Sequence, residues 1–336
     1  MPIKGLGPHG ERASTLLQLS LSDSEASLIR EAQNTAAIVL HTTGSDWSKQ
    51  QIAGIVRTLG SYGTAVVEVI DCEFSYGKQN AALDRLARNP PSVVISIPIG
   101  NTAVAASHRA VARSGARLIL LDNAPTGLLP GADYASVVSA DNFGLGQIAA
   151  ETLSPYLPSG SSAGIISYGV DFFVTHQREI AFRKWMAEMR PDIALRTARF
   201  TDVNLVAPTV DGFLAVNTSI AGLFAVWDVP AIQAIAAMRA RGRSLPVTTI
   251  DLGNEVAIEM AAGGMIKGIG AQQPHDQGVA AAMAALQALV GRAPPTWVAL
   301  PGIKVTRENV VEAYQTIWHA PAPRALMAEL QDTRER

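Results

Sequence analysis

The chain has 336 residues, with 27 Lys plus Arg against 29 Asp plus Glu, for a formal net charge of −2. Only 17% of the residues are charged and 48% are hydrophobic, whereas about 25% are charged in an average soluble domain. This composition excludes an intrinsically disordered chain, and the lack of a basic excess gives no overall electrostatic support for binding a nucleic-acid backbone. The length predicts two domains, and the single cysteine, Cys72, cannot form an intramolecular disulfide.

The chain shows no membrane or export signal. No run of about 20 apolar residues occurs, so we expect no transmembrane helix. Residues 1–35 lack a basic start followed by an apolar segment. Either the protein stays in the cytoplasm or its export signal has already been removed, and the sequence leaves both interpretations open.

From residue 36 onward, a short apolar run alternates with a polar turn and a segment of helical periodicity. The runs are rich in Val and Ile and uniformly apolar, which is typical of parallel strands buried on both faces. They lie at 36–40, 65–70, 92–97, 117–121, 136–139, 163–167, 223–226, 247–250 and 267–271. The pattern predicts doubly wound parallel sheets. So many runs fit two α/β domains better than one sheet, with a break near Ala140–Asp141.

Helices are expected between these runs and near both ends. The clearest amphipathic segment covers 47–59, where Ile52, Ile55, Val56 and Leu59 are at helical spacing. Shorter helices are expected at 23–33, before the first run, and around 308–318, near the end.

Polar and aromatic side chains follow the predicted strands. Because ligands of open parallel sheets bind beyond the carboxyl ends of the strands, we expect a ligand site there. The residues at these ends are His41, Ser45, Asp46, Trp47, Asp122, Asn123, Phe172, His176, Arg178, Trp227, Asp251 and Gln272. Carboxylates, amides and a guanidinium match hydroxyl groups, and Trp rings offer flat apolar faces.

Some of these residues have plainer explanations. An Asp after a strand is often a helix N-cap, and this applies to Asp46, Asp141 and Asp228. The convergence of several such residues at one edge favours a ligand site over a set of caps.

Motifs for catalysis and cofactors are weak. Gly144–Ala149 fits G-x-G-x-x-A, but no ribose-binding acid follows at the expected place, so helix packing explains these glycines better. The six histidines show no metal-ligand spacing, and Ser167 lacks the glycines of a nucleophile elbow. We therefore expect no cofactor, no metal and no catalytic residues.

The strand-end residues, taken together from about Thr35 to Tyr314, resemble periplasmic sugar-binding proteins of the ribose/galactose class, the type I solute receptors of ABC importers. Ser45 and Trp47 match the loop after the first strand, and Asp122-Asn123 matches an Asp-Arg pair. Further matches are Ala140-Asp141-Asn142, Arg178 with Phe182, Phe200 after the next strand, Trp227-Asp228, Asp251 and Gln272. The sequence departs from the pattern at Ser48, Asn123 and Trp227, so the particular sugar does not carry over.

The resemblance implies two similar doubly wound parallel-sheet lobes joined by a hinge of three crossovers, near Ala140–Asp141, Gln272 and Pro301–Val305. It implies an N-terminal lobe of 36–140 plus 273–303 and a C-terminal lobe of 141–272 plus 304–320. Residues 1–35 form an extension and residues 321–336 a tail. The ligand would lie between the lobes, which close around it.

We expect Trp47 and Trp227, assisted by Phe172 or Phe200, to stack on a sugar ring. Asp122, Asn123, Arg178, Asp251 and Gln272 would read its hydroxyls. The predicted site contains one Arg, Arg178, and four Asp, which are Asp46, Asp122, Asp228 and Asp251. Such a site disfavours anions, so we expect the ligand to be a neutral pentose or hexose or a cyclic polyol. The resemblance also implies a monomeric periplasmic receptor, a membrane permease as partner and no nucleic-acid partner.

Three alternatives remain open. A lac-type repressor core shares this fold, but residues 1–35 contain no basic recognition helix. A hydrolase could use the Asp side chains as paired acids. A sensory receptor would signal occupancy to a kinase rather than to a permease.

Overall fold

The computed structural model describes residues 2–332, which divide into two compact units. The first unit contains Pro2–Asp141 and Gln273–Leu300, and the second contains Asn142–Gln272 and the residues from Pro301 onward. The chain therefore crosses between the units after Asp141, Gln272 and Leu300. Each unit has one six-stranded sheet with helices on both faces, so the prediction of two α/β lobes built on parallel sheets is confirmed.

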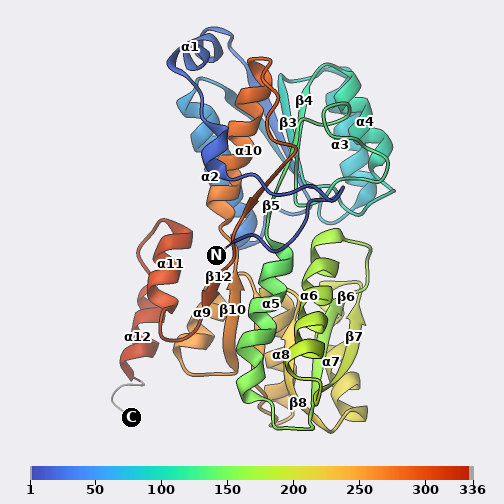
Figure 1. The fold of residues 1–336 in the computed structure, drawn as a ribbon, viewed down its shortest axis with the longest axis vertical. Helices are drawn as coiled ribbons and strands as arrows, with labels where there is room; N and C mark the ends of the chain where they lie inside the picture. Colours follow the sequence, from blue (N-terminus) through green and yellow to red (C-terminus); the bar gives the residue numbers. More distant parts are fainter. Residues whose placement is uncertain (1, 333–336) are drawn as a thin grey trace. The chain divides into compact units, whose positions relative to one another are not determined.

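The sheet of the first unit has the strand order β11-β5-β4-β3-β1-β2, and all its pairs are parallel. Its elements are η1 (Leu16–Leu19), α1 (Asp23–Glu31), β1 (Thr35–Leu40), α2 (Asp46–Ser61), β2 (Ala65–Asp71), α3 (Tyr76–Arg88), β3 (Val93–Ser96), α4 (Ala105–Arg113), β4 (Arg117–Leu121), β5 (Ser136–Ala140), α10 (Pro274–Leu289) and β11 (Trp297–Leu300). Helices α2 and α10 pack together on one face, and α3 and α4 cover the other (Figure 1).

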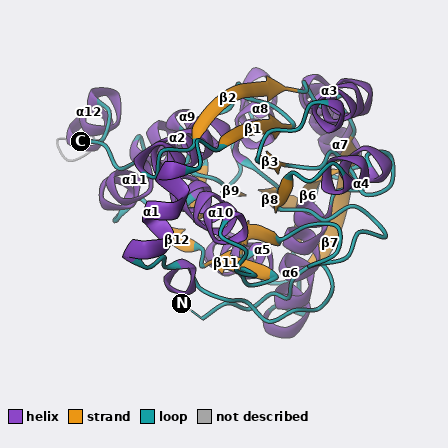
Figure 2. Ribbon diagram, turned by 90° about the horizontal axis from the view of Figure 1, so that it is seen from above, coloured by secondary structure: helices purple, strands orange, loops and turns teal. Residues whose placement is uncertain are grey.

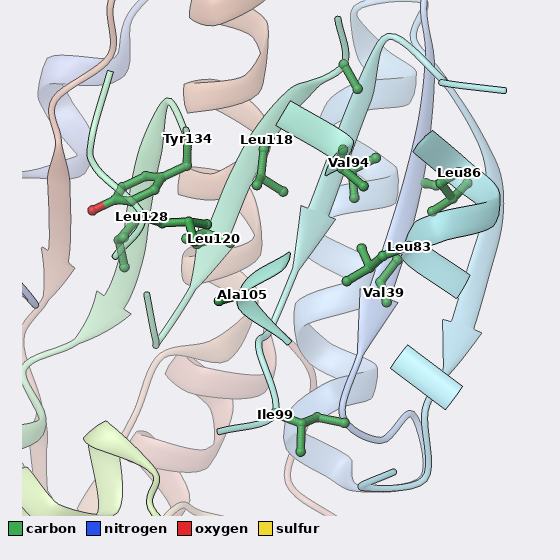
Figure 3. Packing of buried hydrophobic residues seen from close by; sticks show 14 of the residues in the cluster. Val39, Leu83, Leu86, Val94, Ile99, Ala105, Leu118, Leu120, Leu128 and Tyr134 are labelled. Carbon is green, nitrogen blue, oxygen red and sulfur yellow. The ribbon is translucent and has the colours of Figure 1, made fainter. Parts of the chain in front are cut away.

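The apolar core explains why the inner strands are uniformly apolar. Every residue of β3 and β5 is buried. On the face covered by α3 and α4, Val39, Val94 and Leu120 from three strands belong to one buried cluster with Leu83 and Leu86 of α3 (Figure 3). Since helices cover both faces of the sheet, the residues on both sides of each inner strand need apolar side chains.

The second unit repeats this architecture with the strand order β12-β10-β9-β8-β6-β7. Figure 2 labels β12, β9, β8, β6 and β7 of this sheet from left to right. Its elements are α5 (Asn142–Leu153), η2 (Ser154–Tyr156), β6 (Ser162–Tyr168), α6 (Phe173–Met189), β7 (Ala194–Phe200), η3 (Val203–Leu205), α7 (Val206–Val216), β8 (Ile220–Ala225), α8 (Asp228–Ala240), β9 (Val247–Ile250), α9 (Asn254–Ala261), β10 (Ile266–Ala271), β12 (Ile303–Val305), α11 (Val310–Trp318) and α12 (Arg324–Asp332). No helix among residues 2–332 is long and apolar enough to span a membrane.

Two details correct the expectations from sequence. Strand β12 pairs antiparallel with β10, so the second sheet is not wholly parallel. The chain reaches β12 directly from β11 of the other unit, with only Pro301 and Gly302 between the two strands. Phe200 does not follow a strand but is the last residue of β7.

The two units have equivalent close contacts between helices. A Cβ on Gly278 of α10 would lie 2.3 Å from the Gln51 carbonyl oxygen of α2, and a Cβ on Gly146 of α5 would lie 2.2 Å from the Arg178 carbonyl oxygen of α6. Only glycine allows such approaches. The glycine of the G-x-G-x-x-A motif at position 146 therefore serves helix packing, as the sequence suggested.

Candidate functional site

In the second unit, four parallel strands end at one edge of the sheet. Tyr168 is the last residue of β6, and Trp227 lies two residues beyond β8. Asp251 directly follows β9, and Gln272 directly follows β10. The parallel pairing of these strands brings their carboxyl ends together, which is the edge where open sheets bind ligands.

Three aromatic rings form a cluster at this edge. The ring centroids of Tyr168 and Trp227 are 5.3 Å apart with an interplanar angle of 86°. The Phe200 ring lies 5.5 Å from Tyr168 and 5.3 Å from Trp227. Since each ring contacts the other two, one pair edge-to-face and two pairs tilted, Trp227 is kept in one orientation while remaining partly exposed.

Next to the aromatic cluster lies a buried polar group centred on Asp251. Gln272 Nε2 donates to Asp251 Oδ1 at 2.7 Å, and Arg178 Nη1 is 3.9 Å from Asp251 Oδ2. Burial raises the pKa of Asp251, although the Arg178 guanidinium and the Gln272 amide act in the opposite direction. The backbone of Asp251 is left-handed, with φ 72°, a conformation that Asp tolerates better than most residues.

Arg178 is 4% exposed and is held within its own unit. Its Nε donates to Asn142 Oδ1 at 2.9 Å, and its Nη1 donates to the Val226 carbonyl at 2.9 Å. Because Val226 directly precedes Trp227, the guanidinium ties the polar group to the aromatic cluster. A role of Arg178 in reading ligand hydroxyls stays a prediction, and the bonds that the structure shows give it a structural role.

The first unit has its own aromatic group, in which His41 and Trp47 follow β1 and Phe74 follows β2. The His41 ring lies 5.8 Å from Trp47 and 4.9 Å from Phe74, edge-on in both contacts. Loss of hydration lowers the pKa of His41 to about 4, against the opposing charge of Asp71. His41 is therefore neutral at physiological pH. Trp47 Nε1 is buried without a hydrogen-bond partner in residues 2–332.

Asp71 fixes the loops after β1 and β2, which contain His41 and Phe74. Its Oδ2 accepts hydrogen bonds from the Thr43 backbone N at 3.0 Å and the Thr43 hydroxyl at 2.7 Å, and its Oδ1 accepts one from the Glu73 backbone N at 2.8 Å. Burial acts to raise the pKa of Asp71, but these hydrogen bonds outweigh it and the pKa is lowered. A carboxylate at the end of β2 therefore positions the loop after β1.

Asp122 and Asn123 follow β4 and are buried, at 4% and 1% exposure. Asp122 is left-handed, with φ 60°. Asn123 Nδ2 donates to the Gly100 carbonyl at 3.1 Å and to Asn101 Oδ1 at 3.0 Å. Both Nδ2 hydrogens of Asn123 therefore hold the loop after β3.

The remaining predicted residues are at helix starts. Ser45 is the N-cap of α2 and accepts a hydrogen bond from Ser48 N, and Asp46 is the first residue of that helix. Phe172 is the N-cap residue of α6. His176 Nδ1 is 3.7 Å from Asp171 Oδ1. Asp228 begins α8 and accepts a hydrogen bond from Val229 N through its own side chain.

In the second unit the structure thus brings together Arg178, Asp251 and Gln272, and separately Phe200 and Trp227. In the first unit it brings His41 against Trp47. Sequence reasoning missed Tyr168, Phe74 and Asp71. Tyr168 and Asp71 directly follow the predicted runs at 163–167 and 65–70 and are the last residues of β6 and β2, so the strand-end rule could have found both.

A groove of about 650 Å³ lies elsewhere in the first unit, between α3 and α4. Its lining includes Asp84, Arg88, Arg109 and Arg113. It contains no residue of the predicted site, so it does not bear on the strand-end residues.

Comparison with known proteins agrees with the fold. Residues 36–293 match the family model described as a periplasmic binding protein domain. No curated protein matches the chain by sequence. The chain belongs to the periplasmic binding protein family, and its fold is the type I fold of that family.

Solved structures of ABC transporter solute-binding proteins share this fold. One from Agrobacterium vitis, bound with α-D-tagatopyranose, has a TM-score of 0.77 and 21% identity, with 87% of this chain and 100% of that chain covered. One from Agrobacterium radiobacter, in complex with D-arabinose, has a TM-score of 0.76 and 19% identity over 87% and 99%. A periplasmic ribose ABC transporter protein from Conexibacter woesei has a TM-score of 0.73 and 16% identity over 87% and 98%.

Proposed function

We propose that this protein is the solute-binding receptor of a carbohydrate ABC importer and that it captures a neutral sugar or a cyclic polyol. The main support is the arrangement in the second unit, where Arg178 of the buried Arg178–Asp251–Gln272 group bonds to the carbonyl of Val226, the residue before Trp227 of the Tyr168–Phe200–Trp227 cluster. An aromatic face suits the C–H surface of a sugar ring, and charged and amide groups suit its hydroxyls.

The first unit supplies the complementary half of the proposed site. Trp47 offers a second ring and an unpartnered Nε1 donor, and Asp122 offers a buried carboxylate. We propose that the two halves close on the ligand by bending at the three crossovers. A closed, dry site strengthens each hydrogen bond and rejects sugars that lack a hydroxyl, because its own polar groups are then left unpaired.

Charge supports a neutral ligand. The proposed site contains four carboxylates but a single guanidinium, that of Arg178, which already donates to Asn142 and Val226. The carboxylates are those of Asp46, Asp122, Asp228 and Asp251. A sugar acid or sugar phosphate would bring further negative charge to these carboxylates.

This proposal places the protein in the periplasm, as a monomer with a membrane permease as partner. It acts by binding, without catalysis, cofactor or metal, and without nucleic acid. The alternative of a lac-type repressor needs a helix-turn-helix, which contains two helices. Residues 2–34 contain one α-helix, α1, and one short 3₁₀ helix.

A thermal-shift screen tests the proposal. The panel contains D-ribose, D-arabinose, D-fucose, D-tagatose and myo-inositol, with D-glucuronate and ribose 5-phosphate as anionic comparators. A ligand at 100 times its Kd adds about 2.7 kcal/mol of stability, so one neutral compound should raise Tm by several degrees. No shift with any neutral compound, or displacement of the neutral ligand by D-glucuronate, would overturn it.

A further inference from the structure

The residues before the family match form a structured arm. The N-terminal arm, residues 2–34, precedes the matched residues 36–293 and packs on the first unit. Its Leu19 and Ile29 are each 1% exposed, and Ile3 and Ala13 pack against the core cluster that contains Tyr134 and Trp297. The arm is therefore an integral part of the first unit.

Backbone contacts attach the arm to β11, the edge strand. Ser14 N donates to the Trp297 carbonyl at 3.0 Å, and Ala299 N donates to the Ser14 carbonyl at 3.1 Å. Gly7 lies against the Trp297 ring so closely that an added Cβ would be 2.9 Å from Trp297 Cγ. These contacts fix where the start of the arm runs.

The start of the arm ends on Asp141. Lys4 N donates to Asp141 Oδ2 at 2.6 Å, and Gly5 N donates to Asp141 Oδ1 at 2.9 Å. Asp141 is 2% exposed, so these are shielded, charge-assisted bonds, which are stronger than neutral ones. Both carboxylate oxygens are engaged by the arm.

Asp141 lies where the chain leaves the first unit. It is the last residue before the first crossover, and its backbone N donates to the carbonyl of Leu300 at 2.8 Å. Leu300 is the last residue before the third crossover. The arm therefore binds Asp141, and the hydrogen bond from Asp141 to Leu300 links the first crossover to the third.

We propose that the N-terminal arm restrains the Asp141 crossover and so raises the affinity of the receptor for its ligand. The proposal rests on the proposed function, in which the units close on a sugar. Two bonds to one carboxylate limit the conformations that Asp141 samples in the ligand-free protein. Fewer conformations then have to be lost on closure, which favours binding. Asp141 is a positioning residue in this account and does not contact the ligand.

Two variants test the restraint, one at the Asp141 crossover and one in the arm. Asp141→Asn keeps the shape of the side chain, and Asn suits helix starts as well as Asp does, but one arm N–H then faces an amide group instead of a carboxylate oxygen. Gly7→Val pushes the arm off Trp297 and leaves the crossover sequence unchanged. Asp133→Asn, which also alters a carboxylate that accepts a backbone N–H, and Leu17→Ala, at a side chain 89% exposed, are the matched controls.

Two measurements on the full chain decide the outcome. Calorimetry with the neutral compound that gives the largest thermal shift in the panel above should show Kd increased about fivefold or more for both variants and within twofold for both controls. Hydrogen exchange of residues 139–144 in the ligand-free protein should become at least tenfold faster in both variants only. An unchanged or lower Kd overturns the proposal, even if exchange becomes faster.

The two proposals fail in different ways. If no neutral compound binds the parent protein, the sugar-receptor function is wrong, and equal exchange in parent and variants would separately refute the restraint. If a sugar binds parent and variants with the same Kd, the function stands and the restraint is wrong.

Discussion

Asp122 and Asp251 occupy equivalent positions in the two units, and both have a left-handed backbone. Each directly follows the third strand in the order of its sheet, β4 or β9, with φ of 60° and 72°. Their surroundings differ, because Arg178 and Gln272 accompany Asp251, whereas Gln51 of α2 makes the helix contact equivalent to that of Arg178. The two units thus share one acidic position with different side chains around it.

The left-handed backbone predicts how substitutions at Asp251 will differ. Asp251→Asn should unfold at a higher urea concentration than Asp251→Ala, because Asn tolerates this conformation. Asp251→Ala should lose about 1–2 kcal/mol more, since Ala is strained there and Gln272 Nε2 loses its acceptor. Urea unfolding measures both, and equal stabilities would contradict the role of the backbone conformation. Both variants should lose affinity for a neutral sugar.

Removing Arg178 should affect stability and binding together. Arg178→Ala leaves the buried Asp251 without its nearby cation, which we expect to cost about 3 kcal/mol, and should weaken sugar binding at least tenfold by calorimetry. The control, Arg241→Ala, removes an exposed pair with Asp211 and should change stability by less than about 1 kcal/mol. Full sugar affinity in folded Arg178→Ala would refute the binding role.

A substitution at Trp47 should weaken sugar binding while leaving stability nearly unchanged. Its Nε1 is buried without a partner within the described residues 2–332, so Trp47→Phe removes an unsatisfied donor and should leave stability within about 1 kcal/mol of the parent. Sugar affinity should nevertheless fall at least fivefold. Trp318 Nε1 donates to the Leu252 carbonyl at 2.9 Å, so Trp318→Phe should do the reverse, lowering stability without changing Kd.

The close helix contacts predict opposite effects for two glycine substitutions in the second unit. Gly146→Ala puts a methyl group against the Arg178 carbonyl and should cost about 1–3 kcal/mol, with a loss of sugar affinity because Arg178 is displaced. Gly212→Ala, in α7, has no neighbour within 4 Å of the added Cβ and should stabilise by roughly 0.5–1 kcal/mol. Urea unfolding of the pair gives the comparison, and similar values would contradict it.

His108 should make stability depend on pH. Its ring is fully buried, with Nε2 3.0 Å from Ser96 Oγ and Nδ1 2.8 Å from the Val104 carbonyl. Burial lowers the pKa of His108 from 6.5 to about 4, although the Val104 carbonyl opposes the shift. Between these values the unfolded chain binds more protons, so the free energy of unfolding falls as the pH falls.

Lowering the pH from 7 to 4.5 should cost about 2 kcal/mol through His108 alone. The measurement is urea unfolding at both pH values for the parent and for His108→Gln. A pH dependence that is identical in the two proteins would show that His108 does not contribute.

The sequence predicted the inner strands well and the edges less well. Strands such as β3 and β5 are buried throughout, and that leaves an unmistakable apolar run. β7 is an edge strand whose residues alternate between exposed and covered, so Ala194–Phe200 does not appear as an apolar run. The antiparallel β12 has only three residues, too few to show a direction.

For the candidate site, the sequence predicted the positions of residues but not the contacts of their side chains. The apolar runs correctly predicted that Trp227, Asp251 and Gln272 follow strands, because topology alone places such residues. The hydrogen-bond partners of these side chains could not be predicted from the sequence, since the bond from Arg178 to Asn142 joins residues 36 positions apart. The contact of Tyr168 with Trp227 depends on ring orientation, which no spacing in the sequence encodes.

The two edges of the first sheet differ in their exposure to other chains. At β11, Ser14 of the arm takes backbone hydrogen bonds that a foreign strand could otherwise use. At β2, Val67 and Val69 are 61% and 41% exposed, and the strand pairs only with β1 within its sheet. Uncovered edges invite intermolecular pairing, so β2 is where self-association would begin when the protein is concentrated, and Val67→Lys is the change that should improve its solubility.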